Sequence, residues 1–131
     1  MFFALALAVS VTAQATSQPW SFVESVGGLR VDLPVLKSGH WYLPVLADVS
    51  GLHDFGAKPT AMNSGLACSG VEARVVPPNV YLTLRTGIAG FKASSRCPDA
   101  QLGVPPRGRY QVLYRSPDGK TNRIGEIEIG L

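Results

Sequence analysis

Apolar and polar residues alternate in short runs along most of the chain, and glycine and proline separate the runs. The alternation spans residues 71–75 and resumes over residues 80–84, on either side of Pro77-Pro78-Asn79. A period of two is typical of half-buried strands, and proline followed by asparagine favours a turn. The pattern therefore predicts two strands joined in a hairpin.

The C-terminal segment carries the same signal more strongly. Residues 109–115 and 122–129 flank Ser116-Pro117-Asp118-Gly119, a turn sequence, so we expect a second hairpin here. One register brings opposite charges together on one face and leaves apolar residues on the other. It pairs Arg109 with Glu128, Gln111 with Glu126 and Leu113 with Ile124, and places Tyr110, Val112 and Ile127 on the opposite face.

Two further regions of the N-terminal half have strand character. Residues 29–35 alternate, with Pro34 on the outer parity, which predicts an edge strand. The tetrapeptide Leu-Pro-Val-Leu occurs at 33–36 and again at 43–46, and the turn-like residues 37–40 between the copies predict a hairpin. We expect long irregular stretches after Gly51 and from Gly87 to Pro106, with a short strand around residues 66–68.

These strands define the expected fold class. Prolines and glycines interrupt nearly every window in which an amphipathic helix could develop. A chain of 131 residues is the size of one domain, and its turn signals recur about every ten residues. The sequence predicts an all-β, antiparallel, immunoglobulin-like β-sandwich of about six to seven strands.

The first residues indicate export. Residues 1–15 carry no charge, contain an apolar stretch and end in Ala13-Gln14-Ala15, the small-x-small pattern that signal peptidase recognises. We expect a secretory signal peptide at 1–15, an N-terminal arm at 16–28 and a single sandwich domain at 29–131. Because no apolar run reaches the length of a transmembrane helix, we expect a protein that does not span the membrane.

The cysteine count agrees with this compartment. Cys68 and Cys97 form an even pair without zinc-like neighbours or a Cys-x-x-Cys motif, which predicts one disulfide in an oxidising environment.

One cluster carries candidate chemistry: Asp48, Ser50, His53 and Asp54. A hydrolase would use Ser50 as nucleophile and His53 as base. However, triad residues normally come from separated segments, and Ser50 lacks the Gly-x-Ser-x-Gly turn of an exposed nucleophile. The turn chemistry of Asp48 and Ser50 explains the cluster without catalysis.

A metal site is the other interpretation of the cluster. His53, Asp48, Asp54 and His40 could act as ligands, but copper and zinc sites need more nitrogen or sulfur donors than this chain offers. We therefore expect no cofactor and no catalytic residues.

Charge is concentrated toward the C-terminus. From Arg85 to Arg123 the chain holds eight basic and two acidic residues, against a net charge of +3 for the whole chain. Such a stretch can meet an anionic partner, and tyrosines lie between its arginines. The alternative is a set of solvated strand faces with Arg109 paired to Glu128. The candidate binding residues are Arg96, Arg107, Arg109, Arg115, Arg123, Tyr110 and Tyr114.

These observations favour an exported, non-catalytic binding or accessory module of the cell envelope or extracellular space. Its expected partner is a protein or an anionic envelope component, and export argues against nucleic acid. The alternatives are a small periplasmic metal carrier centred on His53 and a small hydrolase using Ser50 and His53.

Overall fold

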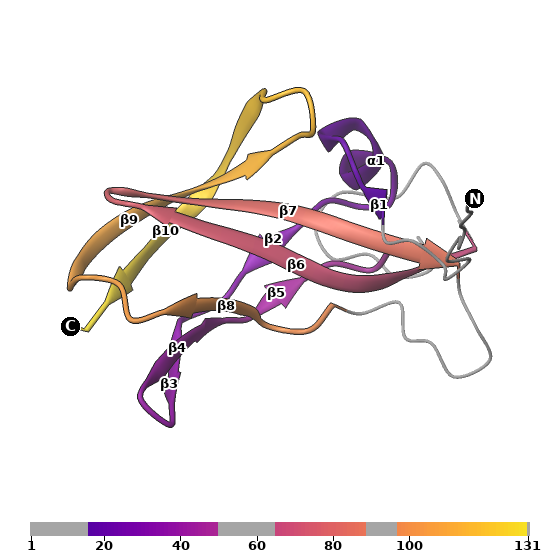
Figure 1. Cartoon of the computed structure of the whole chain (residues 1–131). Coiled ribbons are helices and arrows are strands. Elements are labelled where there is room, and N and C mark those ends of the chain that lie inside the picture. Colours follow the sequence, from indigo (N-terminus) through magenta and orange to yellow (C-terminus); the bar gives the residue numbers. More distant parts are fainter. Residues whose placement is uncertain (1–15, 50–64, 89–96, 131) are drawn as a thin grey trace, which may run out of the picture.

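The computed structural model describes residues 16–49, 65–88 and 97–130 (Figure 1). Within them the chain is mostly β, with ten strands and one short helix. In chain order the elements are β1 (Thr16–Ser17), α1 (Trp20–Ser25), β2 (Arg30–Val31), β3 (Val35–Lys37), β4 (His40–Leu43), β5 (Val45–Leu46), β6 (Leu66–Val76), β7 (Asn79–Ile88), β8 (Ala100–Gly103), β9 (Gly108–Arg115) and β10 (Thr121–Ile129).

A five-stranded sheet is built around β7. Strand β6 pairs with one edge of β7 along its length, whereas β9 and β1 share the other edge. Between β7 and β9 the chain crosses to another sheet to form β8, and β9 returns parallel to β7. The sheet is therefore mixed, and the expected antiparallel immunoglobulin-like sandwich is not confirmed.

The β6–β7 hairpin confirms the predicted alternation. Val80, Leu82 and Leu84 are at most 1% exposed, and the intervening residues of β7 lie on the opposite face. The strands extend beyond the predicted ranges, because β6 begins at Leu66 and continues through a bulge after Cys68.

The β9–β10 hairpin also forms, with Arg109 opposite Glu128 and Gln111 opposite Glu126, as predicted. The third predicted pair is wrong: Leu113 lies opposite Arg123 rather than Ile124. The cause is an irregularity between Arg123 and Gly125, which inserts one residue into β10 and shifts the register.

The N-terminal half forms the predicted hairpin but not the predicted continuous strand. Strands β3 and β4 pair across Ser38 and Gly39, and both turn residues have positive φ, as a tight two-residue hairpin turn requires. The same two chain segments also pair as β2 and β5, but the register of β2 with β5 differs by one residue from that of β3 with β4. The change in register lies around Leu33. This shift breaks the alternation, so Leu33 is 78% exposed instead of facing the core.

Three elements are not predicted by the sequence: α1, β8 and β1. Helix α1 follows Pro19 and buries Val23, and β8 lies inside a stretch expected to be irregular. Strand β1 pairs with β7, so residues assigned to the N-terminal arm take part in both the sheet and the core.

The core lies between the five-stranded sheet and the strands β2–β5 and β8. It combines Val80, Leu82 and Leu84 of β7 with residues such as Leu43 of β4 and Leu102 of β8. The predicted disulfide is present: Cys68 of β6 is bonded to Cys97, which precedes β8, with their Cα atoms 5.1 Å apart. In the described ranges, no helix has the length and apolar character needed to cross a membrane.

Candidate functional site

The outer face of the five-stranded sheet carries many charged side chains in the described part of the chain. On β7, β9 and the last part of β10, every second side chain packs in the core, as Val80, Val112 and Ile127 do. The side chains between these buried residues therefore point outward. This outer face carries five arginines and three glutamates: Arg74, Arg85, Arg109, Arg115, Arg123, Glu72, Glu126 and Glu128.

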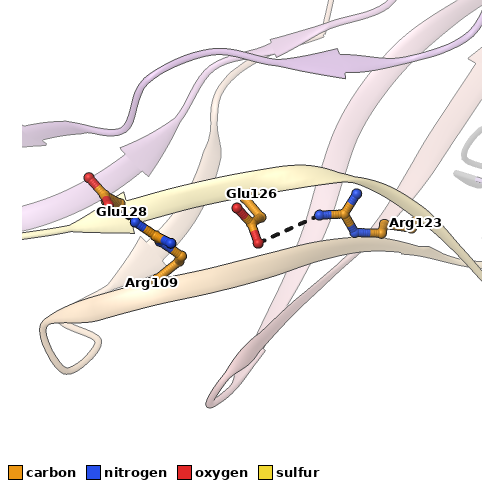
Figure 2. A network of polar contacts seen from close by, with 4 residues as sticks. All are labelled: Arg109, Arg123, Glu126 and Glu128. Atoms are coloured by element: carbon orange, nitrogen blue, oxygen red, sulfur yellow. Dashed lines mark hydrogen bonds and ion pairs between the residues drawn. The ribbon is translucent and has the colours of Figure 1, made fainter.

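Over most of β9 and β10, up to Arg115 at the end of β9, the arginines are paired with glutamates. Figure 2 shows Arg109 beside Glu128 and Arg123 beside Glu126. The distance from Nη2 of the arginine to Oε2 of the glutamate is 2.9 Å in the first pair and 3.6 Å in the second. The hydrogen bond to Glu128, followed by the charges of Glu128 and Glu126, raises the pKa of Arg109. This half of the outer face is close to neutral, as the solvated-face interpretation predicts.

Over β6 and β7 the balance is different, because Arg74 and Arg85 form no ion pair within the described residues. Arg115, at the end of β9, likewise has no carboxylate partner in those ranges. Its guanidinium stands over the ring of Tyr81, 5.9 Å from the ring centre. Glu72 is the acidic residue on this half of the face.

A hollow of about 480 Å³ lies among these side chains, and we call it the Tyr81 hollow. It is lined by Ser17, Glu72, Ala73, Arg74, Tyr81, Thr83, Arg115, Ser116 and Pro117. Two arginines and a tyrosine thus surround one open depression, together with several hydroxyl groups. Guanidinium groups of this kind bind carboxylate, sulfate or phosphate oxygens.

Beside the hollow, β7 lacks a neighbouring strand on the edge that it shares with β9 and β1. Strand β9 pairs with Asn79–Leu82 and β1 with Arg85–Thr86, which leaves a gap beside residues 83 and 84. Hydrogen bonds that are not part of the strand pairing connect the chain across this gap. The Thr83 hydroxyl donates to the Arg115 carbonyl at 2.7 Å, and the Gln18 N–H donates to the Leu84 carbonyl at 2.9 Å.

The side chain of Tyr114 closes the gap from the side of the core. Its hydroxyl accepts a hydrogen bond from the Leu84 N–H at 2.9 Å and donates one to the Gln18 carbonyl at 2.6 Å. Burial raises the pKa of Tyr114. The side chain is fully buried, so it supports the hollow from below rather than lining it.

The structure separates the sequence-predicted binding residues. Arg109, Arg115 and Arg123 lie on the outer face, but only Arg115 among the three lines the Tyr81 hollow. Tyr110 and Tyr114 are at most 2% exposed, and the Tyr110 hydroxyl donates to the Pro106 carbonyl, so neither ring reaches the outer face.

The remaining predicted binding residues lie elsewhere. Arg107 is exposed and lies against Gly130, since a Cβ at that glycine would stand 2.7 Å from the Arg107 Cγ. Arg96 lies outside the described residues.

The predicted catalytic and metal cluster is only partly described. Ser50, His53 and Asp54 lie outside the described residues. Asp48 is 1% exposed, whereas His40 is exposed at the tip of the β3–β4 hairpin, where its Nδ1 lies 3.2 Å from the Ser38 carbonyl. Within the described ranges, no three His, Cys, Asp or Glu side chains gather in a way that could hold a metal ion.

Sequence reasoning missed Arg74 and Tyr81, although both belong to the alternation that predicts the β6–β7 hairpin. The alternation itself could have indicated them, because its polar positions place Arg74 and Tyr81 on the same outer face of two neighbouring strands. Comparison with protein-family models, curated proteins and solved structures finds no match for this chain.

Proposed function

We propose that the protein is an exported, non-catalytic binding module of the cell envelope or extracellular space, and that it takes an anionic ligand or an acidic protein segment at the Tyr81 hollow. The observation that carries this proposal is the placement of Arg74 and Arg115 beside Tyr81, without a carboxylate partner for either arginine in the described ranges.

Two features support this position over the rest of the outer face. Arg109 of β9 and Arg123 of β10 are already paired with Glu128 and Glu126, so an incoming anion would have to compete with those carboxylates. At the hollow, by contrast, the guanidinium of Arg115 is held over Tyr81, which lowers the conformational entropy that binding must remove.

Matched pairs of variants test the proposal. The ligand probe is immobilised heparin, a general polyanion, at a salt concentration at which the Debye length is about 8 Å. The variant R74Q/R115Q removes two positive charges from the hollow, and R109Q/R123Q removes two from the paired half of the face. We expect R74Q/R115Q to weaken binding about ten-fold or more, as the loss of two charged contacts implies, and the control to stay within about two-fold.

An equal loss of heparin affinity in the two variants would contradict the proposal, because binding would then depend on the net charge of the protein and not on the Tyr81 hollow. Absence of heparin binding by the unmodified protein would contradict it as well.

Export and the finer fold are part of the same proposal. The small-x-small pattern at 13–15 and the disulfide support passage into an oxidising compartment. The disulfide between β6 and the residue before β8 supports an immunoglobulin-like arrangement, because it joins two different sheets. Mass spectrometry of the exported protein should find Thr16 at the N-terminus and no free thiol. An N-terminus at Met1 or two free thiols would contradict export.

A further inference from the structure

A second hollow lies next to the first on the same face. Its volume is about 240 Å³, and Ser69, Gly70, Val71, Glu72 and Arg85 line it. Arg85 is exposed on the outer parity of β7 and has no ion-pair partner within the described residues. A ligand lying along the β6–β7 hairpin would therefore meet unpaired guanidinium groups at two places.

The spacing between the two places follows from the register. Arg74 lies opposite Tyr81, and Gly70 lies opposite Arg85, so the two positions on β7 are four residues apart. At a rise of about 3.4 Å per residue, the separation is about 14 Å. A single phosphate or carboxylate is too small to contact both arginine positions, whereas an extended chain with repeated negative groups can do so.

Glu72 restricts the kind of chain that fits. Its side chain lines both hollows and lies opposite Thr83, between the two arginine positions. A polymer with a negative charge on every unit would place a charge against this carboxylate and would therefore bind more weakly than a chain with a neutral unit at this place. A neutral unit with hydroxyl groups at the same place would instead donate hydrogen bonds to Glu72, because a carboxylate is an acceptor.

From this arrangement we infer that the ligand is an acidic polysaccharide in which uronate units alternate with neutral sugars. It lies along β6 and β7, with one carboxylate at Arg74 and Arg115, a neutral sugar over Glu72 and a second carboxylate at Arg85. This inference rests on the proposed anion-binding function and adds the chemical class of the ligand and its direction on the sheet.

The experiment uses three probes in isothermal titration calorimetry with the mature protein: a hexasaccharide of alternating glucuronate and N-acetylglucosamine, free glucuronate, and inorganic polyphosphate as a densely charged chain. We expect the hexasaccharide to bind at least about ten-fold tighter than glucuronate, because it reaches both hollows. We also expect it to bind more tightly than polyphosphate.

Two variants locate the contacts. R85Q should weaken hexasaccharide binding about five-fold, which corresponds to one exposed charged contact of about 1 kcal/mol, and leave glucuronate binding unchanged. E72Q should raise the affinity for polyphosphate and lower that for the hexasaccharide. R123Q removes the same charge from a paired arginine and serves as the control, with a change below about two-fold.

The possible failures are distinguishable. If polyphosphate or free glucuronate binds as tightly as the hexasaccharide, or if R85Q behaves like R123Q, the inference about the ligand is overturned while the anion-binding function stands. If none of the probes binds and heparin does not bind either, the proposed function itself fails.

Discussion

Replacing Tyr114 by phenylalanine tests how the gap beside β7 is closed. The hydroxyl joins two segments far apart in sequence, because it accepts from the Leu84 N–H and donates to the Gln18 carbonyl. Y114F keeps the ring, which packs against Trp20 with the ring centres 5.5 Å apart, and removes only these two hydrogen bonds. On the edge of β7 that β9 and β1 share, no strand pairs with Leu84, so none can replace the lost acceptor.

The expected loss follows from the burial of the groups left behind. Leu84 is fully buried, and a buried N–H without an acceptor costs about 1–3 kcal/mol. The lost bond to the Gln18 carbonyl adds about 1 kcal/mol. We therefore expect Y114F to lower the free energy of unfolding by about 2–4 kcal/mol, which corresponds to a melting temperature lower by at least about 8 °C in a domain of this size.

The assay is urea unfolding followed by circular dichroism, with Y81F as the matched control. The Tyr81 hydroxyl accepts a hydrogen bond from the Asn79 side chain on the partly exposed outer face, so its removal should cost no more than about 0.5 kcal/mol. If Y114F unfolds at the same denaturant concentration as Y81F, the hydroxyl does not close the gap and this reasoning is refuted.

Three further predictions concern stability. Replacing Cys68 and Cys97 by alanine should cost about 3–4 kcal/mol in guanidinium unfolding, since the disulfide closes a separation of 29 residues; an unchanged midpoint would contradict this. Burial raises the pKa of Tyr114 in the folded state, so the folded protein keeps its full stability below the unfolded-state pKa near 10 and loses stability as the pH rises through the folded-state pKa. Thermal melts should show this loss in the unmodified protein and a smaller loss in Y114F. A double-mutant cycle on Arg109 and Glu128 should give a coupling energy within the error of the unfolding measurement, because both side chains are exposed; a coupling clearly above that error would contradict this prediction.

The parts of the fold that could be predicted from the sequence depend on local alternation. The β6–β7 and β9–β10 hairpins, with the Arg109–Glu128 pair, follow from residues close in the chain. The parallel pairing of β7 with β9 could not be predicted in this way, because no local pattern records which distant strand becomes the neighbour. Helix α1 has six residues, too few for a helical period to show.

The same limit applies to the candidate site. The number of basic residues between Arg85 and Arg123 predicts a positively charged surface. In the folded chain, however, the glutamates of β10 pair with Arg109 and Arg123 and neutralise part of this charge. The Tyr81 hollow instead combines Arg74 and Arg115, which lie on separate strands. Their association depends on the non-local sheet order, so sequence reasoning found Arg115 and missed Arg74.

The measurement that tests the central claim most directly is a titration of the isotope-labelled mature protein with the alternating uronate hexasaccharide, followed by backbone amide chemical shifts. The account predicts that the largest shifts lie at Glu72, Arg74, Tyr81, Arg85 and Arg115. Shifts confined to the β3–β4 hairpin or to the Arg109–Glu128 half of the outer face would contradict it.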